Sequence, residues 1–295
     1  IETYGSLDEM LKKSDVNLLV HITPHNLHYP LAAKCLKAGK HVVTEKPFVI
    51  TTKEADSLIA LADKAGVMVS TYHNRHWDGW ILRAVEQIVN KNVIGDVHRV
   101  EAHMGGYGMP GPWWRTSKSI SGGILYDWGV HLLEYSLQIV RSDMVEVAGY
   151  AKTGYWASQV PAKFPWKNDM NEDEAAATVR FKNGAVINLS ISHVRTDGRP
   201  HFLSFHGSKG SYLINWDGWT TRLPKKNKEG KWQAVEKTGK HPKSRGELFY
   251  QNIADHLCGK ADLVITPQWA RRPIHILDLA NQSAKVGKAL PAKYA

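Results

Sequence analysis

The stretch "VNLLVHITPHNLHYPLAAKCLKAGKHVVTEKP", residues 16–47, decides the fold, because it holds two strand patterns separated by one helix pattern. Residues 16–24 are almost continuously apolar, as in a strand buried on both faces. Residues 27–39 have helical spacing, with Gly39 placed to end the helix. Residues 40–47 form the next strand pattern. A strand, a crossover helix and a second strand predict two parallel neighbours in one sheet.

The same alternation extends to both sides of this stretch. "SLDEMLKKS" (6–14) has helical spacing, and "TKEADSLIALADKAG" (52–66) is an amphipathic helix pattern with Thr52 as its candidate cap. "VMVSTYHNRH" (67–76) is another strand pattern. We therefore predict an α/β domain over residues 1–77, a parallel sheet with helices on both faces.

After residue 77 the pattern changes to strands that alternate between polar and apolar residues. "EAAATVRFKNGAVINLSISHV" (174–194) predicts a hairpin turned at Asn183–Gly184, and "HFLSFHGSKGSYLIN" (201–215) one turned around Lys209–Gly210. Further helix patterns begin at residues 77, 246 and 266. We predict that residues 78–295 form an α+β domain with one large, mostly antiparallel open sheet and helices on one face.

Composition argues against several classes of protein. The formal net charge is +10, but much of the excess lies in residues 222–245, which we interpret as a solvated hairpin or loop and not as a nucleic-acid surface. No apolar run is long enough to span a bilayer. The two cysteines argue against a disulfide framework. We expect no nucleic-acid or membrane partner.

The stretch "GGILYDWGVHLLE" (122–134) sets Asp127 and His131 four residues apart. If residues 124–140 are helical, that spacing puts the carboxylate and the imidazole on one face of a helix that otherwise looks buried. Taken alone, the pair is better explained as an Asp–His contact at the start of a helix.

These stretches together closely resemble the Gfo/Idh/MocA family, the glucose–fructose oxidoreductase and inositol dehydrogenase type of NAD(P)-dependent enzyme. The resemblance rests on "ITPHNLH", "AGKHVVTEKP", "ADKAGVMVSTYHNR", "WWR" and "GGILYDWGVHLLE", which occur in the family's order. It implies a Rossmann-type domain over residues 1–77, a substrate-binding and oligomerisation domain over 78–295, and NAD, or NADP, as the cofactor.

The chain departs from the family at its beginning. The family starts with a strand and a G-x-G-x-x-G turn that binds the pyrophosphate at a helix N-terminus. This sequence opens at "IETYGSLDEM", and no later stretch replaces that turn. The missing portion corresponds to roughly two βα units of about 30 residues each. We expect a fragment; the alternative is a protein that has lost half of its nucleotide site.

The resemblance implies a catalytic group of Lys46, Asp127 and His131. Oxidation of a secondary alcohol requires a hydride to leave carbon and a proton to leave oxygen, and a neutral imidazole suits the proton acceptor. The Asp127 carboxylate, one turn away, is expected to orient the imidazole. A positive Lys46 would stabilise the developing alkoxide. Glu134 stands where the family usually has an aspartate.

The resemblance also implies which residues line the two halves of the site. Those expected against the cofactor are Thr23, Pro24, His28, Glu45, Lys46, Asn74, Arg75, Trp114 and Arg115. Those expected to bind the substrate are Lys46, Arg115, Tyr126, Asp127, His131 and His193. Tryptophans are frequent, and those at 113, 114, 128, 156 and 166 fall where the substrate cleft is expected. Their faces can pack against the C–H face of a sugar ring.

Three functions stay open at this stage. The first is oxidation of a ring hydroxyl of a sugar, glycoside or cyclic polyol, or the reverse. The second is a glycosidase or lyase that oxidises transiently and eliminates a group without net redox change. The third is a non-catalytic ligand-binding or oligomerisation protein. A metal site built from His73, His76, His103 and His193 is disfavoured, because no thiolate or carboxylate cluster accompanies them.

The expected assembly is a homodimer or homotetramer, since the large sheet of family members commonly packs against a second copy. A low cysteine content and cofactor dependence favour the cytoplasm.

Overall fold

The computed structural model describes residues 2–292, and the first of its two sheets is small and parallel. Its strands are β1 (Leu18–His21), β2 (His41–Thr44) and β3 (Val69–Thr71), hydrogen-bonded in the order β1-β2-β3. Both pairings are parallel. The parallel arrangement predicted from residues 16–76 is confirmed.

Helices cover both faces of this sheet. The helices α1 (Leu7–Lys13), α2 (His28–Lys37) and α3 (Thr52–Ala65) come from the same part of the chain. Val42 packs in the core beneath α2 and α3, whereas the next residue, Val43, faces the other side. There it meets Phe249 and Ile253 of α8 (Leu248–Leu257).

The second layer on the small sheet thus comes from α8, far along the chain, which the division at residue 77 did not anticipate. A second correction concerns α3. Its cap is Thr51, whose hydroxyl accepts a hydrogen bond from the Glu54 amide (3.2 Å), while the Glu54 carboxylate accepts one from the Thr51 amide (2.9 Å). This capping box excludes Thr52 from the role.

The second sheet has nine strands in the order β11-β10-β9-β8-β4-β7-β6-β5-β12. Within the described residues, β4 and β7 are the one parallel pair of this sheet, and its other pairings are antiparallel. The strands are β4 (Val97–Gly105), β5 (Met144–Lys152), β6 (Glu174–Phe181), β7 (Val186–Ser192), β8 (Leu203–Gly207), β9 (Gly210–Ile214), β10 (Trp219–Lys226), β11 (Trp232–Gly239) and β12 (Leu290–Pro291). The hairpins β6–β7 and β8–β9 turn where the sequence predicted.

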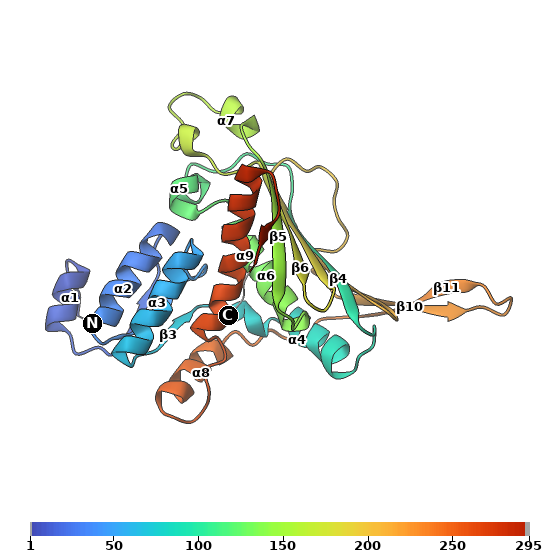
Figure 1. The fold of residues 1–295 in the computed structure, drawn as a ribbon, viewed down its shortest axis with the longest axis horizontal. Coiled ribbons are helices and arrows are strands. Elements are labelled where there is room, and N and C mark those ends of the chain that lie inside the picture. The colour runs from blue at the N-terminus through green and yellow to red at the C-terminus, as the bar shows by residue number, and fades with distance from the viewer. Residues whose placement is uncertain (1, 293–295) are drawn as a thin grey trace.

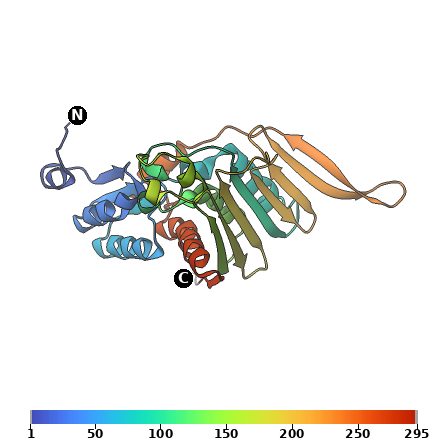
Figure 2. The ribbon, with the colours of Figure 1, turned by 90° about the horizontal axis from the view of Figure 1, so that it is seen from above.

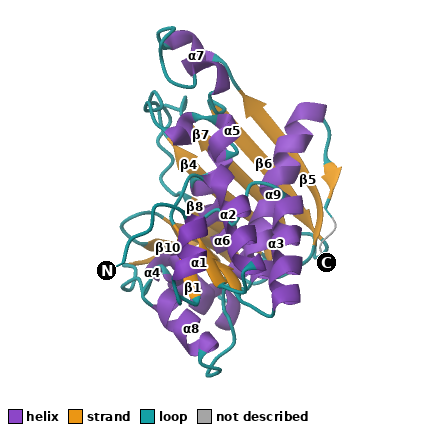
Figure 3. Cartoon of the chain, turned by 90° about the vertical axis from the view of Figure 1, so that its left-hand side faces the viewer, coloured by secondary structure: helices purple, strands orange, loops and turns teal. Residues whose placement is uncertain are grey.

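Two helices pack on one face of the large sheet, α6 (Trp128–Ile139) and α9 (Pro267–Val286). The approach of α9 is close: a Cβ on Gly149 of β5 would lie 2.0 Å from the Ala280 carbonyl oxygen. The same helix packs along α3, so it joins the two sheets (Figures 1 and 3).

Short helical segments fill the connections. They are η1 (His25–Leu27), η2 (Asn74–Trp77), α4 (Gly79–Ala84), the π-helical η3 (Val85–Asn90), η4 (Trp114–Thr116), α5 (Lys118–Ser121), η5 (Ile124–Tyr126), α7 (Tyr155–Gln159) and η6 (Lys167–Asp169).

The basic stretch lies on an antiparallel ribbon, β10 and β11, which extends beyond the body of the molecule (Figure 2). Every residue of β11 is exposed except Gly239, which is intermediate. A solvated hairpin was the sequence interpretation of this stretch. No helix within residues 2–292 has the length and apolar character needed to cross a membrane.

Candidate active site

The first part of the site is a cavity of about 300 Å³ at the carboxyl ends of β1 and β2. Open parallel sheets bind their ligands at this edge. The cavity is lined by Ile22, Thr23, Pro24, His25, Glu45, Lys46, Trp114 and Arg115. Six of these residues follow the two strands directly, and the last two come from η4. Among the residues expected against the cofactor, Thr23, Pro24, Glu45, Lys46, Trp114 and Arg115 thus share one cavity.

His28 is placed differently from the expectation. Its ring is fully buried between two backbone carbonyls, with Nδ1 2.7 Å from Pro47 O and Nε2 3.1 Å from Thr23 O. The Lys46–Pro47 peptide in this turn is cis. Both ring nitrogens face backbone carbonyls, to one of which the ring donates, so His28 connects the two turns and lines neither cavity. Its expected cofactor contact is corrected to a positioning role.

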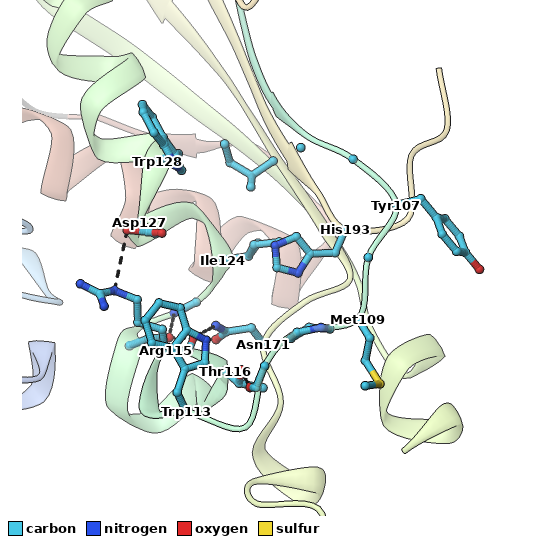
Figure 4. A pocket seen from close by; sticks show the side chains of 18 of the residues that line it. Tyr107, Met109, Trp113, Arg115, Thr116, Ile124, Asp127, Trp128, Asn171 and His193 are labelled. Carbon is cyan, nitrogen blue, oxygen red and sulfur yellow. Dashed lines mark hydrogen bonds and ion pairs between the residues drawn. The ribbon is translucent and has the colours of Figure 1, made fainter. Parts of the chain in front are cut away.

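The second part is a cavity of about 470 Å³ at the start of α6 (Figure 4). Two glycines lead into it: Gly122 and Gly123 have φ values of +88° and +127°, which side chains other than glycine rarely adopt. They turn the chain from α5 into η5. The lining consists of residues 105–111 together with His25, Trp113, Arg115, Thr116, Ser121, Gly123, Ile124, Asp127, Trp128, Asn171, Ile191 and His193.

The two cavities meet, because His25 and Arg115 line both of them. Across this junction the Lys46 ammonium donates to Asp127 Oδ1 (2.5 Å) and to the Asp127 carbonyl (3.2 Å). Arg115 Nε lies 3.9 Å from the same carboxylate oxygen. Burial acts to raise the pKa of Asp127, but the attraction and hydrogen bond of Lys46 outweigh it and hold that pKa below its usual value. The site therefore keeps an ion pair between the sheets.

The relation between Asp127 and His131 needs a correction. The helix does not run from residue 124: η5 ends at Tyr126, Asp127 is the N-cap of α6 (φ −87°, ψ −83°), and α6 begins at Trp128. The Asp127 carboxylate bonds to Lys46 and not to His131.

His131 is a buried imidazole that follows Asp127 and Trp128 in α6 but lines neither of the two cavities. It is only 5% exposed, and its Nδ1 has no hydrogen-bond partner within the described residues. Burial lowers the pKa of His131 well below its usual value, and the charges of Lys46, His73 and Arg75 lower it further. At neutral pH the ring is thus in the form that accepts a proton.

Arg115 is held by three neighbours. Its guanidinium carbon lies 4.9 Å from the Trp113 ring and 4.5 Å from the Trp114 ring. Its carbonyl accepts a hydrogen bond from the Asn171 amide (2.6 Å), whose oxygen accepts one from the Ser121 hydroxyl (3.0 Å). Sequence reasoning missed Asn171, for which spacing offered no signal. It also missed His25, although that residue directly follows the Thr23–Pro24 turn.

Asn74 and Arg75 follow β3 in η2 but line neither of the two cavities. The Arg75 guanidinium lies 4.9 Å from the Trp128 ring and 3.2 Å from Asp78 Oδ2. Arg75 thus contacts Trp128, which lines the larger cavity.

Of the two remaining substrate-binding expectations, one is corrected. Tyr126 is 1% exposed, and its hydroxyl donates to the Ile50 carbonyl (2.7 Å), so the phenol is turned away from the cavity. His193 lines the large cavity, as Figure 4 shows. Its Nδ1 is buried without a partner in the part of the chain that the structure describes.

No group of three or more histidine, cysteine, aspartate or glutamate side chains within residues 2–292 is arranged to hold a metal ion. His76 of the H-x-x-H pair binds Glu134 (2.5 Å), whereas His73 is buried separately.

Comparison with known proteins identifies the family. A model described as "Oxidoreductase family, NAD-binding Rossmann fold" matches residues 1–73, and the "GFO/IDH/MocA C-terminal domain" matches residues 82–213. The uncharacterized oxidoreductase YdgJ of Escherichia coli is 36% identical over 284 residues, which are 92% of this chain and 80% of YdgJ. The chain belongs to the GFO/IDH/MocA family.

Two further relatives of this GFO/IDH/MocA chain have informative names. The scyllo-inositol 2-dehydrogenase (NADP(+)) IolW of Bacillus subtilis is 26% identical over 305 residues, covering 96% of this chain and 81% of IolW. A levoglucosan dehydrogenase in complex with NADH and levoglucosan superposes with a TM-score of 0.81, covering 99% of this chain and 84% of that one. At 17% identity, the latter shows a shared fold only.

This GFO/IDH/MocA protein is an NAD(P)-dependent dehydrogenase that acts on CH–OH groups. The residues at the smaller cavity fit the nicotinamide end of the cofactor. The Ile22 side chain, 79% exposed at the end of β1, offers an apolar surface to the ring. The buried Thr23 hydroxyl has no partner within the described residues. Glu45 and Lys46 add a carboxylate and an ammonium group to the lining of this cavity.

Proposed function

We propose that the protein oxidises a ring hydroxyl of a sugar, glycoside or cyclic polyol to a ketone, or catalyses the reverse reaction. The observation that carries this proposal is the junction of the two cavities at Lys46, Asp127, His25 and Arg115. A cofactor on the sheet side and a carbinol on the α6 side would meet there. A single ammonium group would then reach both.

The reaction divides between the cofactor and the side chains. The bound nicotinamide supplies the acceptor for the hydride that leaves carbon. As the C–H and O–H bonds break and the C=O bond forms, His131 takes the hydroxyl proton. Lys46 stabilises the negative charge that develops on the oxygen, and Asp127 holds Lys46 in place. Burial lowers the pKa of His131, which leaves its ring unprotonated but also weakens it as a base, so the role requires that the bound substrate favour the protonated ring.

The choice of a cyclic substrate is supported by the walls of the larger cavity. Trp128 and Trp113 stand on opposite sides of the space in front of Asp127 (Figure 4). Indole faces pack well against the C–H faces of a sugar ring. Arg115 and His193 supply polar groups for hydroxyls. IolW, by its name, acts on an inositol, which is a polyhydroxylated ring.

A panel of free sugars, glycosides and inositols, assayed for reduced nicotinamide with both NAD and NADP, tests this function. We expect His131→Ala to lower kcat/KM by about 10²- to 10⁴-fold, the usual loss when a general base is removed. His98→Ala, at an exposed position of β4, is the control and should keep wild-type activity. Unchanged turnover in His131→Ala would show that another group accepts the proton. Substrate proton exchange without accumulation of reduced nicotinamide would indicate a redox-neutral elimination instead.

We further propose a homodimer or homotetramer assembled through the face of the large sheet opposite α6 and α9. Figure 1 shows both helices on one side of that sheet. On the other face, polar side chains form hydrogen bonds with one another. Asn188 donates to Glu101 (2.9 Å), and Thr178 donates to Asn188 (3.0 Å). The cytoplasm is the proposed compartment, because Cys35 and Cys258 are free thiols.

A further inference from the structure

The larger cavity has two chemically different ends. Figure 4 shows Asp127 and Arg115 at one end, and Tyr107 and Met109 at the other, with His193 and Asn171 between them. The reacting end is charged. The far end is apolar and open: Tyr107 and Met109 are each 54% exposed. Exposed apolar side chains that gather around one cavity mark a ligand surface, whereas scattered ones need no explanation.

The far end is also held in a fixed conformation. The Tyr107 ring, directed outward beyond His193 in Figure 4, lies 5.4 Å from the Trp156 ring and bonds through its hydroxyl to Tyr155. Asp173 holds this support by accepting hydrogen bonds from the amides of Tyr155 (2.8 Å) and Trp156 (3.0 Å). The aromatic surface is thus ordered before a ligand arrives, which reduces the entropy lost on binding.

The cavity is larger than one ring requires. Its volume of about 470 Å³ lies in the range that accommodates drug-sized ligands, and a single six-membered ring at Asp127 leaves the Tyr107 end empty. A group reaching that end must leave the ring on the side away from the reacting carbon. Among residues 2–292, no Lys, Arg, Asp or Glu side chain lines the far end, which favours an uncharged group there.

We propose that Tyr107 and Met109 form a subsite for a second ring joined to the oxidised sugar through a glycosidic oxygen. This inference rests on the proposed function and makes a glycoside, not a free monosaccharide or inositol, the preferred substrate class. The second ring presents an apolar face, either the C–H face of another sugar or an aromatic aglycone. The same contacts serve both.

The test compares methyl, phenyl and glucosyl β-D-glucosides with free glucose and inositols, using the wild-type protein and saturating cofactor. We expect kcat/KM for the phenyl or glucosyl compound to exceed that for the methyl glucoside by roughly 3- to 10-fold, the effect of one aromatic contact. In Tyr107→Ala combined with Met109→Ala this ratio should fall towards one. Met109→Ala alone should lower this ratio partly. Because this variant keeps Tyr107, it tests the subsite even if the loss of Tyr107 causes a folding defect. Trp232→Ala, on the exposed ribbon, should keep the ratio.

The two glycoside arms distinguish the sources of the second ring. A preference for phenyl alone indicates an aromatic aglycone, and a preference for glucosyl alone indicates a second sugar. Calorimetric titration of the same glucosides gives the ratio of their Kd values as a readout apart from turnover. Oxidation of free rings or methyl glucoside with no preference for the larger compounds would overturn the subsite and leave the proposed function intact. Absence of oxidation of every compound would count against the proposed function itself.

Discussion

At the scale of single residues, buried charge is kept where a partner compensates it. Glu134 is 1% exposed, and its carboxylate accepts hydrogen bonds from His76 (2.5 Å), Gln138 (3.2 Å) and Trp269 (3.2 Å). Burial acts to raise the pKa of Glu134, but the His76 charge and hydrogen bond outweigh it, so the pKa lies below its usual value. These contacts tie α6, one turn beyond His131, to η2 and α9.

Removing His76 should be costly, because the Glu134 carboxylate is buried and would lose the shortest of its hydrogen bonds. We expect His76→Phe to lower the free energy of unfolding at pH 7 by roughly 3–5 kcal/mol, measured by urea denaturation. His76→Phe combined with Glu134→Leu should recover part of this loss, since no charge is then buried. If the single variant were as stable as the wild type, the carboxylate would have to be solvated or protonated in the fold.

The lowered pKa of Glu134 also predicts that the free energy of unfolding decreases at acid pH. A carboxyl group whose pKa is lower in the folded state contributes stability above its unfolded pKa of about 4.3, and this is lost as the pH falls through the folded value. Glu134→Gln removes that titration. Unfolding free energies measured between pH 7 and pH 3 should therefore fall less steeply in Glu134→Gln than in the wild type. Parallel curves would assign the acid sensitivity to other carboxyl groups.

At the scale of elements, α9 is the connection between the two sheets. It packs on β5 at Gly149 and along α3, where Arg271 Nε pairs with Asp56 (2.5 Å) and Asp278 accepts from the Thr52 amide (2.9 Å). This helix, which comes late in the chain, therefore contributes to the placement of the smaller cavity against α6, together with the Lys46–Asp127 pair.

Gly149→Ala tests this contact. The new methyl group would lie 2.0 Å from the Ala280 carbonyl oxygen, so α9 must shift away from β5. Overpacking of this kind costs roughly 1–3 kcal/mol, and we expect the melting temperature to fall accordingly. Gly198→Ala is a matched control, because a Cβ there meets nothing within 4 Å. Equal stability of the two variants would show that α9 is free to move on the sheet.

Periodicity predicted the strands well but could not predict pairings between distant residues. The parallel strands around residues 18–44 and the hairpin at Asn183–Gly184 follow from local patterns of apolar and turn residues. The partner of Asp127 does not: helical spacing pointed to His131, whereas Lys46 lies 81 positions away and is brought near only when the sheets pack. Tyr126 was misplaced for the same reason, since its partner is the Ile50 carbonyl.

At the scale of the whole molecule, the bare face of the large sheet sets the expected assembly. On this face His103 bonds to Ser190 (2.7 Å) and Asn188 bonds to Glu101 and Thr178, so these polar groups need no hydrogen bond from a partner. An isologous contact of this face with itself would give a closed dimer.

Thr178→Arg places a long charged side chain at an exposed position of β6 on that face, opposite its own copy or close to it across a two-fold axis. Like charges and steric overlap should shift the protein from dimer or tetramer towards a smaller species, measured by light scattering after size exclusion at micromolar concentration. Thr153→Arg adds the same charge at an exposed position after β5 and should leave the mass unchanged. An unaltered mass in Thr178→Arg would locate the interface on another surface, and a monomeric wild type would contradict the proposed assembly.

The same variant separates assembly from catalysis. The larger cavity lies on the side of the sheet where α6 and α9 pack. We therefore expect kcat per subunit to stay the same when the mass changes.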